Sequence, residues 1–247
     1  MVANILETKI TYDIYGNGKP IICIHGWLEN KRCFRYQSYK SFLKDYQVIA
    51  LDLPGFGGSG EPKEYSFEEI TEIINGLAEE LKLESFEVLG QCMGTVFALD
   101  YAVRYPEKVE KVILVEPMLY FPWWFKVLLI PKVNKGIIKA FIDFKMVTGI
   151  MNKYRPIKGF RRDFNRMKCL QRVNIPAALS YVKILRRYSR RNHEDRIKEI
   201  TASVLIVSGE NTFRQVKKSV VTLKKLFNID NISHIEKKDK NHFIFFP

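Results

Sequence analysis

The residues best suited to chemistry form a short glycine-flanked segment around Cys92. Residues 89–94 read LGQCMG, so one glycine stands two residues before the thiol and another stands two residues after it. Glycines at this spacing permit a tight strand-to-helix turn that exposes the central side chain in strained backbone. Free N–H groups at the start of the following helix would favour a thiolate and stabilise a nearby oxyanion. We therefore predict that Cys92 is a nucleophile; a buried structural cysteine in a glycine-rich turn is the alternative.

The elements that must position this thiol are predicted by short apolar runs separated by helical patterns. One helical pattern begins at Ser66, where Glu69 three residues later predicts a capping box. Another runs from about Met93 to Arg104 and ends before a proline. Apolar runs of this length, bounded by turn residues, are typical of strands that are buried on both faces. The alternation predicts a mostly parallel sheet, and its five clearest strands are residues 21–24, 48–51, 86–89, 112–115 and 204–207.

Two stretches depart from this alternation. Residues 9–15 alternate between apolar and polar positions before a Gly-Asn-Gly turn, which predicts an antiparallel hairpin at the sheet edge. Residues 119–198 contain basic, aromatic-rich helical patterns and no clear strand. We therefore expect three segments: a first part of the core at 1–118, an inserted helical cap at 119–198, and a second part of the core at 199–247.

Charge is concentrated in the predicted insertion. The chain has 40 Lys and Arg against 27 Asp and Glu, a net charge of +13. Residues 119–200 hold 20 basic and 5 acidic residues, whereas residues 1–118 hold 12 basic and 18 acidic residues. A basic segment favours an anionic ligand or an anionic membrane surface. Nucleic acid is not expected as a partner, because no nucleic-acid-binding motif accompanies the charge. A solvated basic face is the alternative interpretation.

Cysteine spacing and hydropathy limit the class of protein. The four cysteines, at positions 23, 33, 92 and 169, show no CxxC or paired Cys/His spacing, so we predict no metal site. The first residues lack the basic and apolar regions of a signal peptide. No window of about 18 apolar residues is free of charge, which argues against a membrane span. We therefore expect free thiols and a cytoplasmic location.

Taken together, these features resemble the α/β-hydrolase superfamily, and in particular its branch with a helical cap. The likeness covers nearly the whole chain. Besides the segment around Cys92, it rests on IHGW at 24–27, LDLPGFGGS at 51–59 and AVRYPEKV at 102–109. The resemblance implies the α/β-hydrolase fold: a mostly parallel central sheet with helices on both faces and a helical cap insertion. The chain differs from the family pattern at Cys92, where a serine is usual, and at its end, where the family has a final helix.

The resemblance also implies roles for other residues. The backbone N–H groups of Trp27 and Met93 would form the oxyanion hole, and Trp27 would also line the substrate pocket. The general base would be His242, because the segment around it resembles the family's terminal histidine motif. His234 is the competing candidate, but it falls inside a predicted strand. His25 would brace the loop that follows its own strand.

The acidic partner of His242 admits three interpretations. The family usually has an aspartate after the strand at 204–207, but Thr212 stands at that position, and a threonine cannot stabilise an imidazolium as a carboxylate does. Some cap-bearing members place the carboxylate after the preceding core strand, which corresponds to Glu116. A Cys-His dyad is the third interpretation, because a thiol needs little help from an acid.

These residues predict hydrolysis of an ester, thioester or lactone through an acyl-enzyme at Cys92, without a metal or organic cofactor. The substrate would be a small acyl compound, and the basic insertion favours one with an anionic portion. The same insertion favours peripheral contact with an anionic membrane. Two alternatives remain open. The thiol could pass its acyl group to an acceptor other than water, or an inactive fold could bind lipid or protein through its basic insertion.

Overall fold

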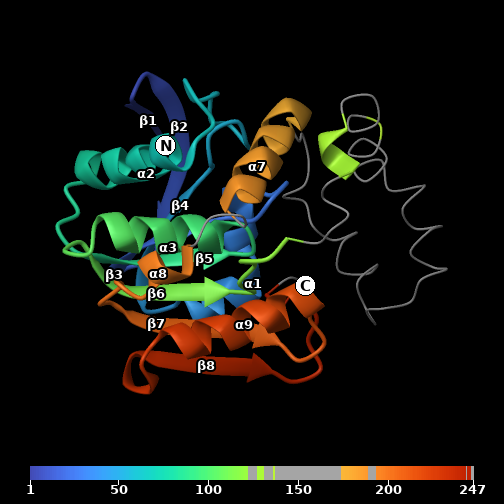
Figure 1. Ribbon diagram of the computed structural model, residues 1–247. Coiled ribbons are helices and arrows are strands. Elements are labelled where there is room, and N and C mark those ends of the chain that lie inside the picture. The colour runs from blue at the N-terminus through green and yellow to red at the C-terminus, as the bar shows by residue number, and fades with distance from the viewer. Residues whose placement is uncertain (122–126, 131–135, 137–173, 189–192, 243, 246–247) are drawn as a thin grey trace.

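The computed structural model describes residues 1–121, 127–130, 136, 174–188, 193–242 and 244–245. Eight strands in this part of the chain form one sheet, in the order β1-β2-β4-β3-β5-β6-β7-β8 (Figure 1). Every neighbouring pair from β4 to β8 is parallel, as predicted. The strands are β1 (Val2–Ile5), β2 (Thr8–Tyr15), β3 (Lys19–Ile24), β4 (Tyr46–Leu51), β5 (Phe86–Gln91), β6 (Val109–Val115), β7 (Ser203–Gly209) and β8 (Ile232–Lys237).

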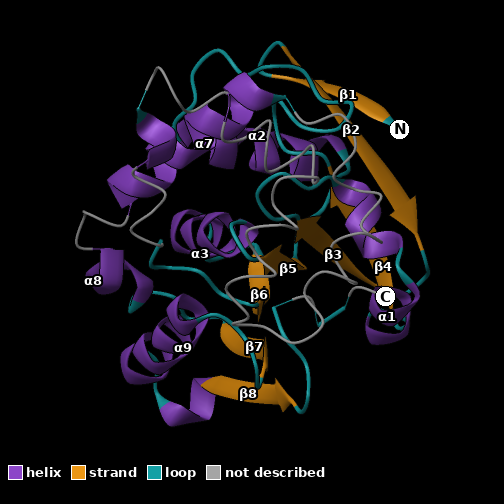
Figure 2. Cartoon of the chain, turned by 90° about the vertical axis from the view of Figure 1, so that its right-hand side faces the viewer, coloured by secondary structure: helices purple, strands orange, loops and turns teal. Residues whose placement is uncertain are grey.

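Helices cover both faces of the sheet, which confirms the predicted fold class. In Figure 2, α3 and α9 lie on one side of the sheet and α1 lies on the other. A separate apolar cluster fills each side, and Ile244 and Phe245 belong to the cluster around α1. The helices of the described residues are α1 (Gln37–Phe42), α2 (Phe67–Glu80), α3 (Gly94–Arg104), α7 (Ile175–Tyr188), α8 (His193–Ile197) and α9 (Arg214–Leu226). The described 3-10 helices include η1 (Lys31–Arg35) and η4 (Ile229–Asn231), and residues 127–129 form a further short 3-10 segment.

The predicted start of α2 is confirmed, but only one half of the capping box forms. Ser66 Oγ accepts a hydrogen bond from the Glu69 N–H at 3.1 Å, which satisfies one of the free donors of the first turn. The Ser66 N–H donates instead to the Glu64 carbonyl at 3.1 Å. Glu68 and Glu69 lie in the first turn, where their negative charges interact favourably with the positive end of the helix dipole.

The predicted edge hairpin has a different partner from the one expected. β2 is antiparallel, as predicted, but it pairs with β1 and β4 rather than with β3. β1 and β2 are joined at Leu6 and Glu7, which both have positive φ, as a tight two-residue hairpin turn requires. β4 lies between β2 and β3 because it pairs with β3 in parallel. The glycine turn at 16–18 therefore connects two strands that are not neighbours.

The described part of the predicted cap consists mainly of α7 and α8. α7 packs on the loops after β3 and β4, since its Ala178 carbonyl accepts the Trp27 indole N–H and its Tyr181 hydroxyl donates to the Pro54 carbonyl, both at 3.0 Å. Most of the stretch between 122 and 173 lies outside the described residues, so the boundaries at 118 and 198 remain predictions. Among the described helices, none is both long and apolar enough to cross a bilayer.

Candidate active site

Cys92 lies between β5 and α3 in strained backbone. Its φ is 49°, in the left-handed region that residues other than glycine seldom adopt. The surrounding hydrogen bonds hold this conformation: the Cys92 N–H donates to the Val115 carbonyl at 2.9 Å. The Cys92 carbonyl accepts the Thr95 N–H at 3.2 Å and the Thr95 hydroxyl at 2.5 Å. A side chain fixed in this way at the start of a helix, and partly exposed, has the geometry predicted for a nucleophile.

The two glycines beside Cys92 are required by close packing. A Cβ at Gly94 would collide with the Ile24 carbonyl oxygen of β3 and lie 2.8 Å from the His25 carbonyl oxygen. A Cβ at Gly90 would lie 2.5 Å from the Gly94 carbonyl oxygen. Because all of these are backbone atoms, no side-chain rotation could relieve the contacts. The absence of side chains at Gly90 and Gly94 therefore allows α3 to begin directly against β3.

His242 and Glu116 are in direct contact. Glu116 Oε2 lies 2.8 Å from His242 Nδ1, and both side chains are buried. The other carboxylate oxygen accepts the Gly209 N–H at 2.5 Å. The Thr212 hydroxyl also donates to Glu116 Oε2. The end of β6 thus supplies the carboxylate, and Thr212, where the family pattern expects an aspartate, supplies a hydrogen-bond donor to it.

The charge state of His242 depends on Cys92 and Glu116. Burial alone would lower the pKa of His242, but a charge interaction and a hydrogen bond with Cys92, together with the Glu116 carboxylate, raise it to about 10. Since Nδ1 faces Glu116, Nε2 is the ring nitrogen that faces the thiol. The arrangement stabilises an imidazolium between two groups that can carry negative charge.

The other two described histidine side chains make contacts of a structural kind. His25 Nε2 accepts the Leu53 N–H at 3.0 Å, and Nδ1 lies 2.8 Å from the Gly26 carbonyl oxygen, which assigns the ring proton to Nδ1. Burial lowers the pKa of His25 to about 4, so the ring is neutral and joins the loops after β3 and β4. His234 lies within β8, as predicted, and its Nε2 contacts Ser208 Oγ at 2.9 Å.

The two residues expected to form the oxyanion hole lie on segments that approach Cys92. Met93 is the buried N-cap residue of α3, where backbone N–H groups have no partner within the helix. On the other segment, a Cβ on Gly26 would lie only 3.2 Å from the Cys92 Cβ. The Trp27 indole N–H donates to the Ala178 carbonyl at 3.0 Å, so this side chain joins the loop to α7. Its role in lining the substrate pocket remains a prediction.

A family model for the α/β hydrolase fold matches residues 19–247. The chain belongs to this family. Among curated relatives, a serine hydrolase-like protein of Danio rerio is 29% identical over 43% of this chain and 33% of its own length. The AB hydrolase superfamily protein YisY of Bacillus subtilis (strain 168) is 34% identical over 40% of this chain and 38% of its own length. The matched part of the chain thus spans less than half the length of these relatives.

Solved structures show the same fold over a larger share of this α/β-hydrolase family member. An esterase from Exiguobacterium antarcticum is 21% identical, with a TM-score of 0.71, and the match covers 99% of this chain and 92% of the esterase. An enol-lactonase from Burkholderia xenovorans LB400 is 17% identical, with a TM-score of 0.73, covering 96% of this chain and 91% of the lactonase. At these identities the likeness shows the fold alone.

One buried polar cluster beside the candidate site was not predicted from the sequence. Glu29, in the loop after β3, accepts the Gly26 N–H at 2.9 Å. Gln91, directly before Cys92, donates its side-chain amide to both Glu29 oxygens at 3.1 Å. The Tyr39 hydroxyl in turn donates to the Gln91 side-chain oxygen. The only sequence signal was an acidic residue close to the His-Gly segment, and nothing local connected it with residues 39 and 91.

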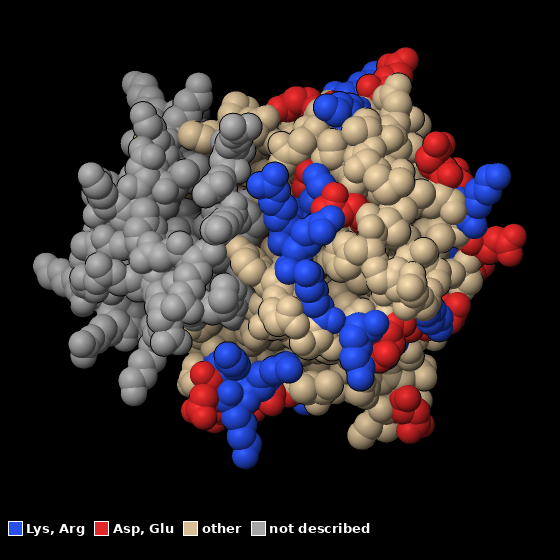
Figure 3. All heavy atoms as spheres, turned by 180° about the vertical axis from the view of Figure 1, so that it is seen from behind, with Lys and Arg blue, Asp and Glu red and all other residues tan. Residues whose placement is uncertain are grey.

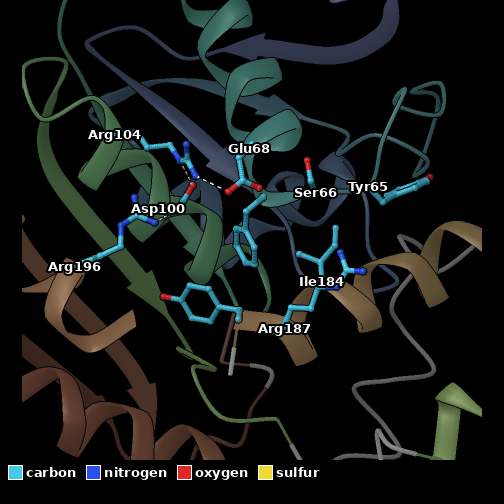
Figure 4. A pocket seen from close by; sticks show the side chains of 10 residues that line it. Tyr65, Ser66, Glu68, Asp100, Arg104, Ile184, Arg187 and Arg196 are labelled. Atoms are coloured by element: carbon cyan, nitrogen blue, oxygen red, sulfur yellow. Dashed lines mark hydrogen bonds and ion pairs between the residues drawn. The ribbon is translucent and has the colours of Figure 1, made fainter. Parts of the chain in front are cut away.

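A pocket elsewhere in this α/β hydrolase lies between α2, α3, α7 and α8 (Figure 4). Asp100 of α3 lies between two arginines there, with 2.6 Å to Arg104 Nε and 3.4 Å to a guanidinium nitrogen of Arg196. Because Arg196 belongs to α8, its ion pair with Asp100 attaches α8 to the sheet-covering helix α3. Neither Cys92 nor His242 is among the residues that line this pocket.

The described cysteines differ in their exposure to solvent. Cys23 and Cys33 are free and buried, whereas Cys92 is partly exposed. Cys169 lies outside the described residues. In the part of the chain that the structure describes, no group of three or more His, Cys, Asp and Glu side chains is placed to hold a metal ion.

Proposed function

We propose that this protein hydrolyses an ester, thioester or lactone through an acyl-enzyme at Cys92. The observation that carries the proposal is the joint position of three side chains: a thiol in strained backbone at a helix start, an imidazole hydrogen-bonded to it, and a buried carboxylate on the far ring nitrogen. This arrangement matches the nucleophile, base and orienting acid of covalent acyl transfer. The names of the structural neighbours, an esterase and an enol-lactonase, support the same substrate class.

In the acylation step, the His242 ring holds the thiol proton as the imidazolium that its raised pKa favours, and Sγ of Cys92 attacks the carbonyl carbon of the substrate. The Trp27 and Met93 N–H groups stabilise the tetrahedral oxyanion. When the intermediate collapses, the bond to the leaving oxygen or sulfur breaks, and the leaving group takes the proton from His242. The acyl group is now a thioester of Cys92.

In the second step, His242 Nε2 removes a proton from water, and the resulting hydroxide attacks the thioester carbonyl. Collapse breaks the bond between carbon and sulfur, releases the acid and returns the proton to the thiol. Glu116 supports both steps, because its carboxylate keeps the proton of the neutral ring on Nδ1 and stabilises the imidazolium that forms.

The proposal is tested by intact mass spectrometry after incubation with a panel of activated acyl esters and thioesters. We expect the wild type to gain one acyl mass that maps to Cys92 and disappears with time. The Cys92→Ala variant should gain none. No adduct with any member of the panel, or an equal adduct in Cys92→Ala, would contradict the proposal. Addition of an amine or alcohol separates hydrolysis from transfer, since a transferase would give the acylated acceptor rather than the acid.

A further inference from the structure

The Glu29 side chain joins the two backbone segments that carry the candidate oxyanion donors. Its Oε2 accepts the N–H of Gly26, the residue before Trp27. Both of its oxygens accept from the Gln91 side chain, two residues before Met93. Glu29 is therefore hydrogen-bonded both to the loop after β3 and to the last residue of β5.

The peptide group between Gly26 and Trp27 is held from its carbonyl side. The Gly26 carbonyl oxygen lies 2.8 Å from His25 Nδ1 and accepts the Glu29 N–H at 3.3 Å. In a planar trans peptide the C=O and N–H bonds point in opposite directions. The Trp27 N–H consequently points away from His25. The backbone N–H of Glu29 thus orients the peptide between Gly26 and Trp27. Its carboxylate orients the preceding peptide, by accepting the Gly26 N–H.

The same cluster reaches the segment that carries His242. The Tyr39 hydroxyl donates to the Gln91 side-chain oxygen, which turns the amide nitrogen of Gln91 toward Glu29. The Tyr39 ring stacks on Phe245, three residues after His242, with 4.3 Å between the ring centroids. Contacts through Glu29, Gln91 and Tyr39 therefore connect the loop after β3 and the end of β5 with the segment that carries His242.

We propose that Glu29 is a positioning residue that fixes the separation of the Trp27 and Met93 N–H groups. The inference rests on the proposed function, because it assigns Glu29 to the same reaction. An oxyanion needs both donors at hydrogen-bonding distance in the transition state, and small displacements of such groups reduce rates strongly. A side chain that accepts from both segments keeps that distance constant.

The pKa of Glu29 reflects its burial and its hydrogen bonds. Burial raises the pKa of Glu29 to about 7, while the Gly26 N–H and the charge of His242 oppose that rise. The Glu29 side chain is buried and accepts N–H hydrogen bonds at both oxygens, which partly offsets the cost of burying its charged form.

The test compares Glu29→Gln with the exchanged pair Glu29→Gln/Gln91→Glu. In Glu29→Gln, the oxygen that accepts the Gly26 N–H is kept, and an amide nitrogen replaces the other oxygen, so one of the two hydrogen bonds from Gln91 becomes a contact between two donors. In the exchanged pair, the new amide donates to the new carboxylate, and the Gly26 and Tyr39 donors keep acceptors. Glu87→Gln is the matched control, because Glu87 is a buried glutamate of β5 that is bound by the Tyr46 hydroxyl at 2.9 Å.

The measurement is the rate of Cys92 acylation and its concentration dependence, with the acyl substrate that labels the wild type. We expect Glu29→Gln to lower the acylation rate constant by about 10- to 100-fold with little change in KM, because the oxyanion exists only in the transition state. The exchanged pair should recover most of that loss, and Glu87→Gln should react like the wild type. Melting temperatures show that the compared variants are folded.

The possible outcomes separate the two proposals. If the wild type is acylated at Cys92 and folded Glu29→Gln reacts at the same rate, the role of Glu29 is overturned while the proposed function stands. A folded exchanged pair that is as slow as Glu29→Gln overturns it as well. If the wild type is never acylated, both proposals fail. Should Glu29→Gln not fold, Tyr39→Phe provides the second variant: it removes the donor that orients Gln91, and it must slow acylation several-fold without raising KM.

Discussion

Glu116 and His242 are 126 residues apart in the sequence, yet their side chains meet at 2.8 Å between Oε2 and Nδ1. β6, β7 and β8 are consecutive parallel strands, so their carboxyl ends lie along one edge of the sheet, as the arrowheads of β6 and β8 show in Figure 1. Glu116 follows β6 and His242 follows β8. The loop after β7 lies between them and contributes Thr212, which donates to the same carboxylate. Sheet order, rather than sequence distance, brings the pair together.

The first prediction concerns the acid. Glu116→Gln removes the negative charge beside His242 and should lower turnover at least about 100-fold, less than the roughly 10⁴-fold loss in a serine triad, since a thiol needs less help from its base. Glu210→Gln is the matched control: Glu210 is exposed and accepts only the Asp239 N–H, at 3.0 Å, among its described contacts. Steady-state kinetics on one ester compares the two. Equal and small effects would favour a Cys-His dyad.

The second prediction concerns thiol reactivity. Cys92 should react first with a limiting amount of iodoacetamide, because it is partly exposed at a helix start. Cys23 is fully buried, and burial raises the pKa of its thiol. Cys33 is also fully buried. Peptide mapping by mass spectrometry gives the order of labelling. Preferential modification of Cys33 or Cys169 would contradict the assignment of Cys92 as the nucleophile.

The third prediction follows from the raised pKa of His242. This pKa is about 10 in the folded protein, against an ordinary value of 6.5, so between these pH values the folded protein binds more protons there than the unfolded chain does. The contribution of protonated His242 to the free energy of unfolding is therefore complete below about pH 6.5 and is lost as the pH rises toward 10. We expect the difference in unfolding free energy between wild type and His242→Gln to shrink over that range in urea denaturation.

A control for the third prediction uses the thiol. Because Cys92 is the largest of the influences that raise the pKa of His242, a Cys92→Ala background should narrow the pH range over which the difference changes. A difference that is constant from pH 6 to about 10 would contradict the raised pKa, since linkage requires a slope wherever the bound protons differ.

The fourth prediction tests the packing beside Cys92. Gly94→Ala places a Cβ against the Ile24 carbonyl oxygen, and β3 cannot move away because it is paired on both sides. We expect destabilisation of about 3 kcal/mol or more, at the upper end of overpacking effects. Gly60→Ala is the control: its nearest atoms, in Lys9, would be at least 3.6 Å from the new Cβ. Thermal denaturation compares them, and similar melting temperatures would contradict the close approach of α3 and β3.

Local sequence patterns predicted where the strands lie in the chain better than which strands pair with each other. The apolar run at 86–89 lies within β5 (Phe86–Gln91), all six residues of which are buried. A run of this kind is visible in sequence because both faces of the strand are covered. The predicted hairpin implied that β2 pairs with β3, which was wrong, because β2 pairs with β4. Strand order depends on how the whole sheet packs. A glycine turn signals a reversal of the chain, but not which strand lies on the other side.

The site was partly predictable for a similar reason. The contact of Glu116 with His242 was expected from the family resemblance together with Thr212, which excluded the usual position of the acid. The contact of Glu29 with Gln91 was not expected, because it joins residues 62 positions apart and neither belongs to a motif with an assigned role. Such side-chain pairs depend on how β3 and β5 are placed side by side, which is a property of the folded chain.

The fifth prediction concerns the basic surface. Lys and Arg side chains form a band on the face opposite to that of Figure 1 (Figure 3). Pairs of exposed basic side chains also lie near the ends of α7 and α9, which are Arg186 and Arg187 in α7 and Lys224 and Lys225 in α9. Arg190 and Arg191, which continue the basic segment after α7, lie outside the described residues. We expect weak binding to anionic vesicles, centred on α7 because it belongs to the segment of net charge +15 at 119–200.

Two variants that remove the same charge test this location. Each basic residue at an anionic surface contributes about 1 kcal/mol, so Arg186→Gln/Arg187→Gln should weaken partitioning by about 2 kcal/mol, roughly 30-fold. Lys224→Gln/Lys225→Gln should weaken it much less. Co-sedimentation with neutral and anionic vesicles at low and high salt measures both, and binding should fall as salt rises because the Debye length shortens. Equal partitioning to the two lipid types would contradict an electrostatic surface, and equal losses in the two variants would contradict its placement on α7. Hydrolysis of a small neutral ester should be unchanged in both, since neither pair contacts Cys92, His242 or Glu116 among the described residues.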